Sequence, residues 1–341
     1  MPALITRPAR AARGITFAGF GGWFQTAFER SILEPFRKAH RDIAVFYYPV
    51  GNSFQGLTML RDQRARPSVD IVLLDTGVAV QADKEGLLDP LDPAALPVMN
   101  DLIPQAIRPG LAGPALMLDS LAIGYDTGMI GAAGKLPAPR SWRGLWDPSY
   151  GRRIALQTPP DPLGLAITAV AAGLFGDGNP KTSLDIAMNA LSQLAPRVAM
   201  WDPLPDIYTA IAMGDVGIGP CWNARAQFQA EQTPGRFAAT IPEEGSPYLT
   251  TTINLVKGSP QPDAAKTLIA WLLAPEAQRL LARTMAYAPV NPKADLPPDL
   301  LARAGATPAM AARRMEVDWV SITAMRDQVT AIWRQRLQVN Q

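Results

Sequence analysis

A glycine-rich stretch near the start of the chain, GFGGWFQTAF, contains the first residues that could bind a ligand. A dinucleotide-binding loop needs the spacing G-x-G-x-x-G, but Gly19 and Gly21 are followed by Phe24 at the third position. A phosphate-binding P-loop needs a lysine after its last glycine, and none follows. What remains is a helix N-terminus, whose free N–H groups and partial positive charge favour an anionic or flat ligand. We expect Trp23 or Phe24 to contact a small ligand; the alternative is that both are core residues.

The sequence gives little support for a metal site or for catalytic activity. One histidine, His40, and one cysteine, Cys221, are too few for a site built from soft or borderline metal ligands. Tyr47 and Tyr48 are neighbours on a predicted strand, so they face opposite ways and cannot both bind a metal ion. The stretch GNSFQG has Gln55 where the G-x-S-x-G elbow of a serine hydrolase needs its second glycine. We therefore predict no catalytic residue, no metal site and no cofactor.

The composition describes a chain with a large core and little net charge. Of 341 residues, 48% are hydrophobic and 18% are charged, with a formal net charge of +2. No basic stripe with interleaved aromatic residues and no run of about 18 apolar residues occurs, so we expect neither a nucleic-acid partner nor a membrane span. The opening MPALITRPARAARG lacks the apolar region of a complete secretory signal. It is either the remnant of a trimmed precursor or a cytosolic start, and we expect residues 1–13 to be loosely ordered.

Strand-like apolar runs alternate with helical patterns along most of the chain. The run GITFAGF precedes a helix that should start near Trp23 and be interrupted by Pro35 near Ser31. The run DIVLLDTG is typical of a buried parallel strand, and ALMLDSLAIGYDTG predicts one or two strands that break at 124–128. A final helix is predicted over about 317–337. The alternation predicts a parallel-sheet α/β protein whose ligand lies at the C-terminal ends of the strands.

Several stretches follow one another in an order that resembles one family over about 280 residues. FGGWFQTAFERSILEPFRK, DIVLLDTG with KEGLLDPLD, and LAIGYDTGMI are the first of them. PRSWRGLWDPSYGRRIALQTP is the most specific, and AMGDVGIGPCWNARA, IPEEGSPYLTTTINLVKG and YAPVNPKA follow it. Together they resemble the extracytoplasmic solute-binding proteins of ABC transporters, in the branch that includes the spermidine and putrescine binders.

The resemblance implies an α/β protein with the type II periplasmic-binding-protein fold: two α/β lobes, a central ligand cleft and a two-stranded hinge. Crossovers between the lobes are expected near 124–126 and 245–248, where small or turn residues can absorb a hinge rotation. A ligand that touches both lobes binds the closed form better and shifts the population towards it. The implied division is 14–122 plus 249–300 for lobe one, and 123–248 plus 301–341 for lobe two, with the C-terminal helices packing back on lobe two.

The residues and the resemblance together supply a set of candidate ligand contacts. Trp222 matches the tryptophan of the family's W-N pair, which stacks on the ligand. Asp75 ends a strand where the family uses polar groups, although it could instead cap the following helix. The candidate ligand-binding residues are Trp23, Phe24, Asp75, Thr76, Asp119, Ser120, Asp161, Trp222, Arg225 and Thr251.

Arg225 and a run of threonines narrow the class of ligand. Arg225 follows Trp222 by three residues, a spacing that puts both on one face of a helix. Its guanidinium offers a bidentate fork for a carboxylate or phosphonate, the alternative being a solvated surface arginine. Polyamine binders place an acidic residue on the strand after P-x-E-G, where this chain has Thr250, Thr251 and Thr252. This departure argues against spermidine and putrescine and favours an amino-acid-like zwitterion or an organic carboxylate.

The predicted function is the substrate-binding component of an ABC importer, which captures a small polar solute by lobe closure and delivers it to a permease. A periplasmic monomer without enzymatic activity is expected. A polyamine-binding protein is one alternative. A cytosolic sensor or an enzyme that reuses the fold is the other.

Overall fold

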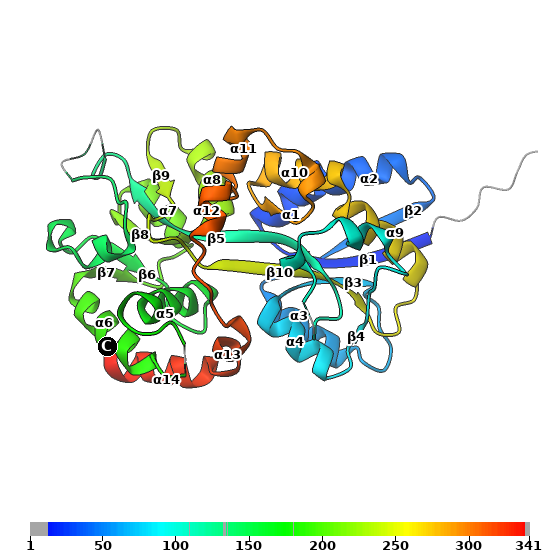
Figure 1. Cartoon of the computed structure of the whole chain (residues 1–341), viewed down its shortest axis with the longest axis horizontal. Coiled ribbons are helices and arrows are strands. Elements are labelled where there is room, and N and C mark those ends of the chain that lie inside the picture. The colour runs from blue at the N-terminus through cyan, green and yellow to red at the C-terminus, as the bar shows by residue number, and fades with distance from the viewer. Residues whose placement is uncertain (1–12, 109, 132–133, 135, 180, 338–341) are drawn as a thin grey trace, which may run out of the picture.

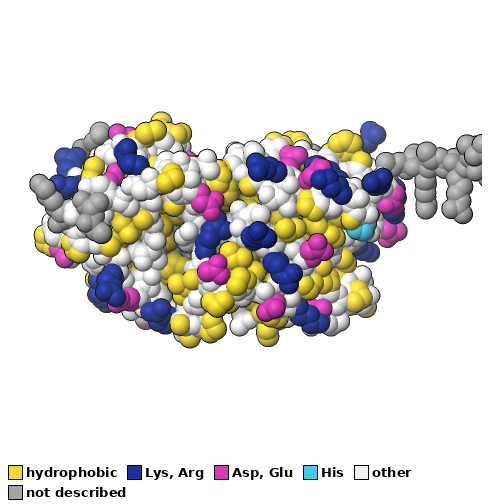
Figure 2. Space-filling model, turned by 90° about the horizontal axis from the view of Figure 1, so that it is seen from above, with side chains coloured by type: hydrophobic (Ala, Val, Ile, Leu, Met, Phe, Trp, Pro, Cys, Tyr) yellow, Lys and Arg dark blue, Asp and Glu magenta, His cyan; other side chains and the backbone are white. Residues whose placement is uncertain are grey.

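The computed structural model describes residues 13–108, 110–131, 134, 136–179 and 181–337. They form two α/β bodies joined side by side by long strands (Figure 1). The segment 1–13, predicted to be loosely ordered, lies outside the described residues except for Arg13, which opens the first strand. On the face that Figure 2 shows, basic and acidic side chains are interspersed with hydrophobic ones.

The strands form one mixed sheet in the order β2-β1-β3-β10-β5-β8-β6-β7. β1 pairs in parallel with β2 and β3, and β6 with β7 and β8, but β5 and β10 run antiparallel to their neighbours. The prediction of a parallel sheet is therefore wrong at the centre, because β10 enters from the opposite body and runs against β3. The strands are β1 (Arg13–Phe20), β2 (Ile43–Val50), β3 (Ile71–Asp75), β4 (Leu88–Asp89), β5 (Ala115–Asp126), β6 (Ile154–Leu156), β7 (Val198–Trp201), β8 (Ile218–Trp222), β9 (Phe237–Thr240), β10 (Tyr248–Val256) and β11 (Ala288–Pro289).

Helices cover the sheet and mostly follow the predicted pattern. Pro35 has no N–H to donate to the turn before it, and the expected interruption is a π-helical segment, Glu29–Leu33, that contains Ser31. The predicted final helix is wrong in its continuity, because it ends at Ala324 and restarts at Arg326. The helices are α1 (Trp23–Phe28), α2 (Glu34–Ala39), α3 (Ser53–Asp62), α4 (Thr76–Lys84), α5 (Pro162–Phe175), α6 (Leu184–Leu194), α7 (Ile207–Met213), α8 (Asn223–Gln232), α9 (Pro262–Leu273), α10 (Pro275–Met285), α11 (Pro298–Arg303), α12 (Pro308–Ala312), α13 (Trp319–Ala324) and α14 (Arg326–Leu337).

Buried apolar side chains separate into clusters that define the two bodies, here called lobe one and lobe two. Strands β1 to β3 and β10 with α1 to α4, α9 and α10 enclose the clusters of lobe one. Strands β6 to β8 with α5 to α7 enclose the cluster of lobe two, and α13 and α14 add Trp319 and Trp333 to it. Because these side chains are buried in separate cores, polar and aromatic residues line the surfaces between the lobes. A hinged protein can hold a ligand between such surfaces.

Within the described part of the chain, three segments pass between the lobes. β5 pairs with β10 up to Ser120 and with β8 from Leu121 onward, so it changes partners before the crossover predicted at 124–126, and it continues unbroken through that stretch. The second crossing leads into β10, where the Leu121 N–H donates to the Pro247 carbonyl at 3.0 Å. The third lies alongside it, with the Met315 N–H donating to the Ser246 carbonyl at 3.0 Å.

Candidate functional site

Aromatic side chains from both lobes meet beside the crossing strands. Trp23, the first residue of α1, stacks on Phe228 of α8 with ring centroids 5.4 Å apart and 29° between the planes. The Trp23 ring also lies nearly parallel to Tyr287, at 6.4 Å and 12°. Trp23 is half-buried, so it is placed to contact a ligand as well as its neighbours. The glycine turn before α1 therefore positions a ring at the junction of the lobes.

Arg225 lies among the same rings. Its guanidinium carbon is 5.7 Å from the centroid of Trp23, 5.4 Å from Tyr208 and 5.1 Å from Phe228. We call these three rings with Arg225 the Arg225 cage. One N–H donates to the Asp206 carboxylate at 3.3 Å, and 17% of the Arg225 side chain is exposed. A guanidinium has five N–H donors, so most of them have no partner among the described residues.

A carboxylate ends β3 on the lobe-one side of the site. The Asp75 carboxylate accepts hydrogen bonds from the hydroxyls of Ser53 at 2.8 Å and Thr251 at 3.3 Å. Burial raises the pKa of Asp75 to about 6, and the two hydroxyls oppose that shift. Asp75 occupies the residue before α4, but its side chain makes no capping bond. The helix-capping alternative is therefore wrong, and no described Lys or Arg side chain neutralises this carboxylate.

Asp119 connects the crossing strand β5 to the start of α8. Its carboxylate accepts a hydrogen bond from the Ala224 N–H at 3.0 Å, and the N–H groups of Asn223 and Ser120 also stabilise the charged form. Burial is the stronger influence and raises the pKa of Asp119 to about 8. A side chain on β5 therefore satisfies N–H groups that the first turn of α8 leaves free.

Trp222 and Arg225 do not share a helix face as their spacing predicted. Trp222 is the residue before α8 and has an extended backbone, so the helical i, i+3 geometry does not reach it. Its indole ring lies 6.4 Å from that of Trp319, whereas Arg225 contacts Trp23 and Phe228. The Trp222 N–H donates to the Tyr208 hydroxyl at 2.8 Å. Trp222 remains half-buried between the lobes, in a different part of the site from the guanidinium.

Two further candidates, Asp161 and Thr76, make hydrogen bonds to the backbone. Asp161 caps α5 by accepting from the Leu163 N–H at 2.8 Å, and burial together with the charge of Asp202 raises its pKa to about 6. The buried Thr76 hydroxyl donates to the Thr250 carbonyl at 3.1 Å.

Phe24 and Ser120 do not lie where the candidate residues next to them in the sequence, Trp23 and Asp119, lie. Phe24 is 2% exposed and stacks on Phe28 at 5.2 Å, so it is a core residue and the candidate contact at this position is wrong. Ser120 points away from Asp119, because successive residues on a strand face opposite sides. It is fully buried, and a Cβ placed on Gly305 would lie 2.6 Å from its hydroxyl oxygen.

The sequence interpretation missed three aromatic residues of the site. Phe228 follows Arg225 by three residues within α8, which is a signal that could have found it. Tyr208 and Tyr287 come from α7 and from the segment before β11, and nothing local in the sequence joins them. Burial, with the charges of Asp119 and Asp75, raises the pKa of Tyr287. Both carboxylates therefore lie close enough to Tyr287 for their charges to influence its pKa.

The part of the chain that the structure describes offers neither a metal-binding group nor a membrane-spanning helix. No group of three His, Cys, Asp or Glu side chains there could hold a metal ion. No described helix has the length and apolar character needed to cross a bilayer. Tyr47 packs against Phe17 while Tyr48 is 45% exposed, which confirms that the two tyrosines face opposite ways. Cys221 is fully buried, as expected of a core residue.

A family model described as "Bacterial extracellular solute-binding protein" matches residues 31–311. The chain belongs to this family. It is therefore a solute-binding component of a transport system rather than an enzyme, and its family is extracellular. The two-lobed fold with a polar and aromatic zone between the lobes agrees with that assignment.

Individual relatives resemble the chain at a distance. It is 25% identical over 286 residues to the gamma-aminobutyric acid-binding protein of Pseudomonas aeruginosa, covering 82% of this chain and 78% of the relative. It is 25% identical over 228 residues to the spermidine/putrescine-binding periplasmic protein of Escherichia coli, covering 65% of this chain and 63% of that relative. An ABC transporter substrate-binding protein from Bradyrhizobium japonicum USDA 110 matches with a TM-score of 0.78 and 22% identity, over 94% of this chain and 99% of that one. The last similarity shows the shared fold.

Proposed function

We propose that the protein is the periplasmic substrate-binding component of an ABC importer and that its solute is an amino-acid-like zwitterion or an organic carboxylate. One observation carries this proposal: near the zone between the lobes lie a guanidinium whose donors are mostly free and a carboxylate without a cationic partner, as far as the described residues go. Closure around a solute would remove water from both groups. Each group would then favour an opposite charge on the solute.

The Arg225 cage provides the end for a carboxylate. Three rings hold the guanidinium, so little side-chain freedom is lost when a ligand binds. Asp206 approaches one N–H at 3.3 Å, which leaves a fork that can make parallel hydrogen bonds to a carboxylate. Because Trp23 belongs to lobe one and Tyr208 to α7 of lobe two, a ligand bound in the Arg225 cage would contact residues of both lobes.

Asp75 provides the end for an amine. Its carboxylate has two hydroxyl donors, Ser53 and Thr251, but carries its charge in a buried place without a cation. An ammonium group would compensate the cost of that burial, as an opposite charge nearby favours ionisation of an acid. Thr251 stands opposite Asp75 in the β10–β3 register. Asp75 therefore lies beside the run of threonines that stands where, by the resemblance, polyamine binders carry an acid.

A polyamine is the second candidate, and the three acidic groups with raised pKa values favour it. Asp75, Asp119 and Asp161 are all partly or fully buried, and cations would stabilise each of them. Two of the three already act as caps, of α8 and of α5, which leaves Asp75 as the acid with hydroxyl partners only. The positive charge of Arg225 close to the same zone opposes a ligand with two or three ammonium groups. The zwitterion is therefore the better fit.

A thermal-shift panel on the purified protein tests this proposal. The panel holds γ-aminobutyric acid, α-amino acids, organic acids, putrescine and spermidine, each at several concentrations. A solute that binds the native state raises the melting temperature by mass action. We expect shifts with solutes that carry a carboxylate. Shifts with polyamines alone would overturn the proposal in favour of the second candidate.

A further inference from the structure

Asp206 is the acidic neighbour of the guanidinium in the Arg225 cage. It is the residue before α7, and one of its carboxylate oxygens accepts a hydrogen bond from the Thr209 N–H at 2.7 Å. The other oxygen lies 3.3 Å from a terminal nitrogen of Arg225. Among the described residues, no other acidic side chain pairs with Arg225. The hydrogen bond to Thr209 therefore fixes a carboxylate beside the guanidinium.

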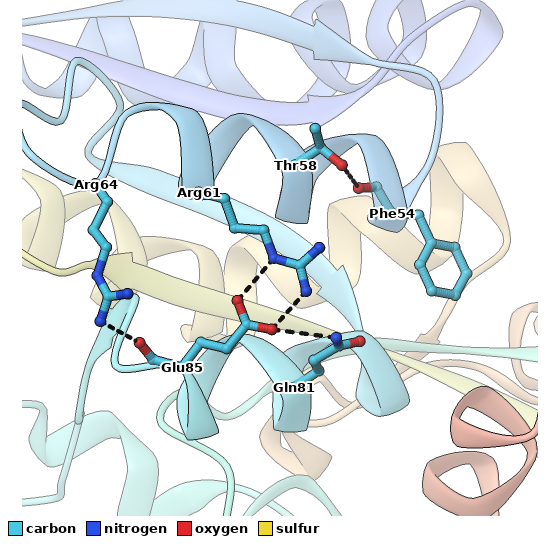
Figure 3. Close-up of polar contacts among 6 residues, drawn as sticks. All are labelled: Phe54, Thr58, Arg61, Arg64, Gln81 and Glu85. Carbon is cyan, nitrogen blue, oxygen red and sulfur yellow. Dashed lines mark hydrogen bonds and ion pairs between the residues drawn. The ribbon is translucent and has the colours of Figure 1, made fainter.

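A second arginine of the chain shows a fully engaged ion pair for comparison. Arg61 donates to the two oxygens of Glu85 at 2.8 and 2.6 Å, and Gln81 donates to the same carboxylate at 3.2 Å (Figure 3). In the Arg225 cage one donor meets one oxygen at 3.3 Å, because the other oxygen of Asp206 caps α7. Asp206 therefore offsets the charge of Arg225 but leaves most of its donors without a partner among the described residues.

Hydrogen bonding and charge place different demands on an acidic group at this fork. The free donors suit any anion with two oxygens, whether a planar carboxylate or a tetrahedral phosphonate. The charge balance is stricter, because Arg225 and Asp206 together carry no net charge. A singly charged group leaves one uncompensated negative charge there, and a doubly charged group leaves two. Three rings surround the guanidinium, whose side chain is 17% exposed, so water screens the excess poorly.

We propose that Asp206 is a specificity-determining residue, which restricts the acidic end of the solute to a single negative charge. The proposal rests on the proposed function, since it requires that the acidic group of the solute binds Arg225. Of the two acidic groups that suit a guanidinium fork, Asp206 favours the carboxylate and disfavours the phosphonate. Replacement of this acid by its amide should relax that choice.

Three solutes that share one three-carbon amine skeleton test the proposal. γ-Aminobutyric acid carries a planar group with one negative charge, and 3-aminopropanesulfonate carries a tetrahedral group with one. At about pH 8.5, 3-aminopropylphosphonate carries a tetrahedral group with close to two negative charges. Isothermal titration gives the three dissociation constants, and the ratio of sulfonate to phosphonate affinity isolates charge from shape. If the solute panel identifies an α-amino acid instead, its sulfonate and phosphonate analogues replace this series.

Two variants that each remove one charge are compared with the wild type. Asp206→Asn keeps an oxygen that can cap α7. It should shift the ratio towards the phosphonate by about tenfold or more, and γ-aminobutyric acid should bind more tightly as well. Asp202→Asn is the control from the same loop, because the Asp202 carboxylate accepts hydrogen bonds from the N–H and hydroxyl of Thr158, at 2.7 and 2.8 Å. The ratio should change by less than about threefold there.

Four results would overturn the proposal. An unchanged ratio in Asp206→Asn would show that this acid does not select the solute's charge. Equal shifts in both variants would assign the selectivity to the charge of the whole loop. Weaker binding of γ-aminobutyric acid in Asp206→Asn would make Asp206 a positioning residue for Arg225. Binding of γ-aminobutyric acid but of neither tetrahedral anion, in all three proteins, would show selection by shape.

The failure of this proposal is distinguishable from the failure of the proposed function. In each of the four cases a solute with a carboxylate still binds, so only the role of Asp206 is rejected. If no carboxylate solute of the panel binds the wild type, the proposed function is rejected instead.

Discussion

The two charged ends of the candidate site are held in contrasting ways. Arg225 lies among three rings with one acidic neighbour, Asp206, at 3.3 Å. Asp75 lies among hydroxyls with no described cation, and its pKa is raised to about 6. The three rings and Asp206 hold the guanidinium in place, whereas burial brings the pKa of the Asp75 carboxyl close to neutral pH. The basic end is therefore a fixed anchor, and the acidic end responds to pH and to the charge of the ligand.

The pH dependence of stability should distinguish the two ends most strongly. The folded pKa of about 6 for Asp75 lies above the 3.8 of the free side chain, so between these values the native state binds more protons than the unfolded state. Asp75 alone should therefore lower the unfolding free energy of the ligand-free protein by about 2 kcal/mol as the pH rises from 4 to 7. Asp161 and Asp119, whose pKa values are also raised, add to this fall. Urea melts at several pH values give this slope.

Asp75→Asn is the matched variant for that measurement. It keeps the shape of the side chain but cannot ionise, so the decline between pH 4 and pH 7 should shrink. Asp161 and Asp119, with pKa values of about 6 and about 8, leave a remaining slope, which Asp119 extends to higher pH. An unchanged slope in Asp75→Asn would mean that Asp75 is not buried as a charged group.

Arg225→Ala should cause the largest loss of ligand affinity. Removal of a charged fork that binds a carboxylate costs about 3 kcal/mol, which is roughly 100-fold in the dissociation constant. Isothermal titration with the solute found by thermal shift measures it. Arg140→Ala is the control, because Arg140 is 81% exposed and pairs with Glu243 outside the site. If both variants bound the solute with equal affinity, the Arg225 guanidinium would not bind the solute and would only connect the two lobes.

Asp75→Asn should reduce affinity by roughly 30-fold, but only for solutes that carry an amine. A plain dicarboxylate or monocarboxylate has no group for the acidic end, so its affinity should stay constant or rise. For the wild type, affinity for an amine-bearing solute should increase from pH 5 to pH 7, because Asp75 must ionise to pair with the ammonium. Titrations with a matched pair of solutes, with and without the amine, decide whether the two ends act separately.

The sequence predicted the frame of this site better than its contacts. The helix start at Trp23, the interruption around Ser31 and the strand ending at Asp75 follow from glycine, proline and apolar periodicity, which act over a few residues. The cage does not, because Tyr208 and Trp23 come from different lobes. Their meeting depends on how the lobes close.

The alternation of side chains along a strand could have excluded one candidate residue, Ser120, from the sequence alone. Asp119 and Ser120 are neighbours on β5, so only one of them can face α8, and the structure assigns that place to Asp119. The role of Asp119 itself depends on the alignment of β5 with the first turn of α8, which no local pattern encodes. The fold class is readable from the sequence, while partners across the two lobes are not.

A change at the α4–α13 contact should affect both ends equally and therefore serves as the reference. Gly77→Ala adds a Cβ 2.1 Å from the Thr323 hydroxyl oxygen and 2.7 Å from the Trp319 carbonyl oxygen, so α4 and α13 must move apart. We expect about tenfold weaker binding of every solute, with or without an amine. Small-angle scattering with saturating solute should show a larger radius of gyration than for wild type. Selective loss of amine-bearing solutes alone would show that this contact acts through Asp75 and not through closure.

The smallest effect is expected at the ring that links the basic end to lobe one. Trp23→Leu removes the stacking on Phe228 and one face of the cage but leaves Tyr208 and Phe228 around the guanidinium. The loss of one aromatic contact is worth about 1 kcal/mol, so carboxylate affinity should fall by roughly fivefold. Trp271→Leu is the control, because its ring packs edge-on against Phe36 within lobe one. If Trp23→Leu instead matched Arg225→Ala, the anchor would depend on the ring as much as on the charge, and the basic end would be no more fixed than the acidic one.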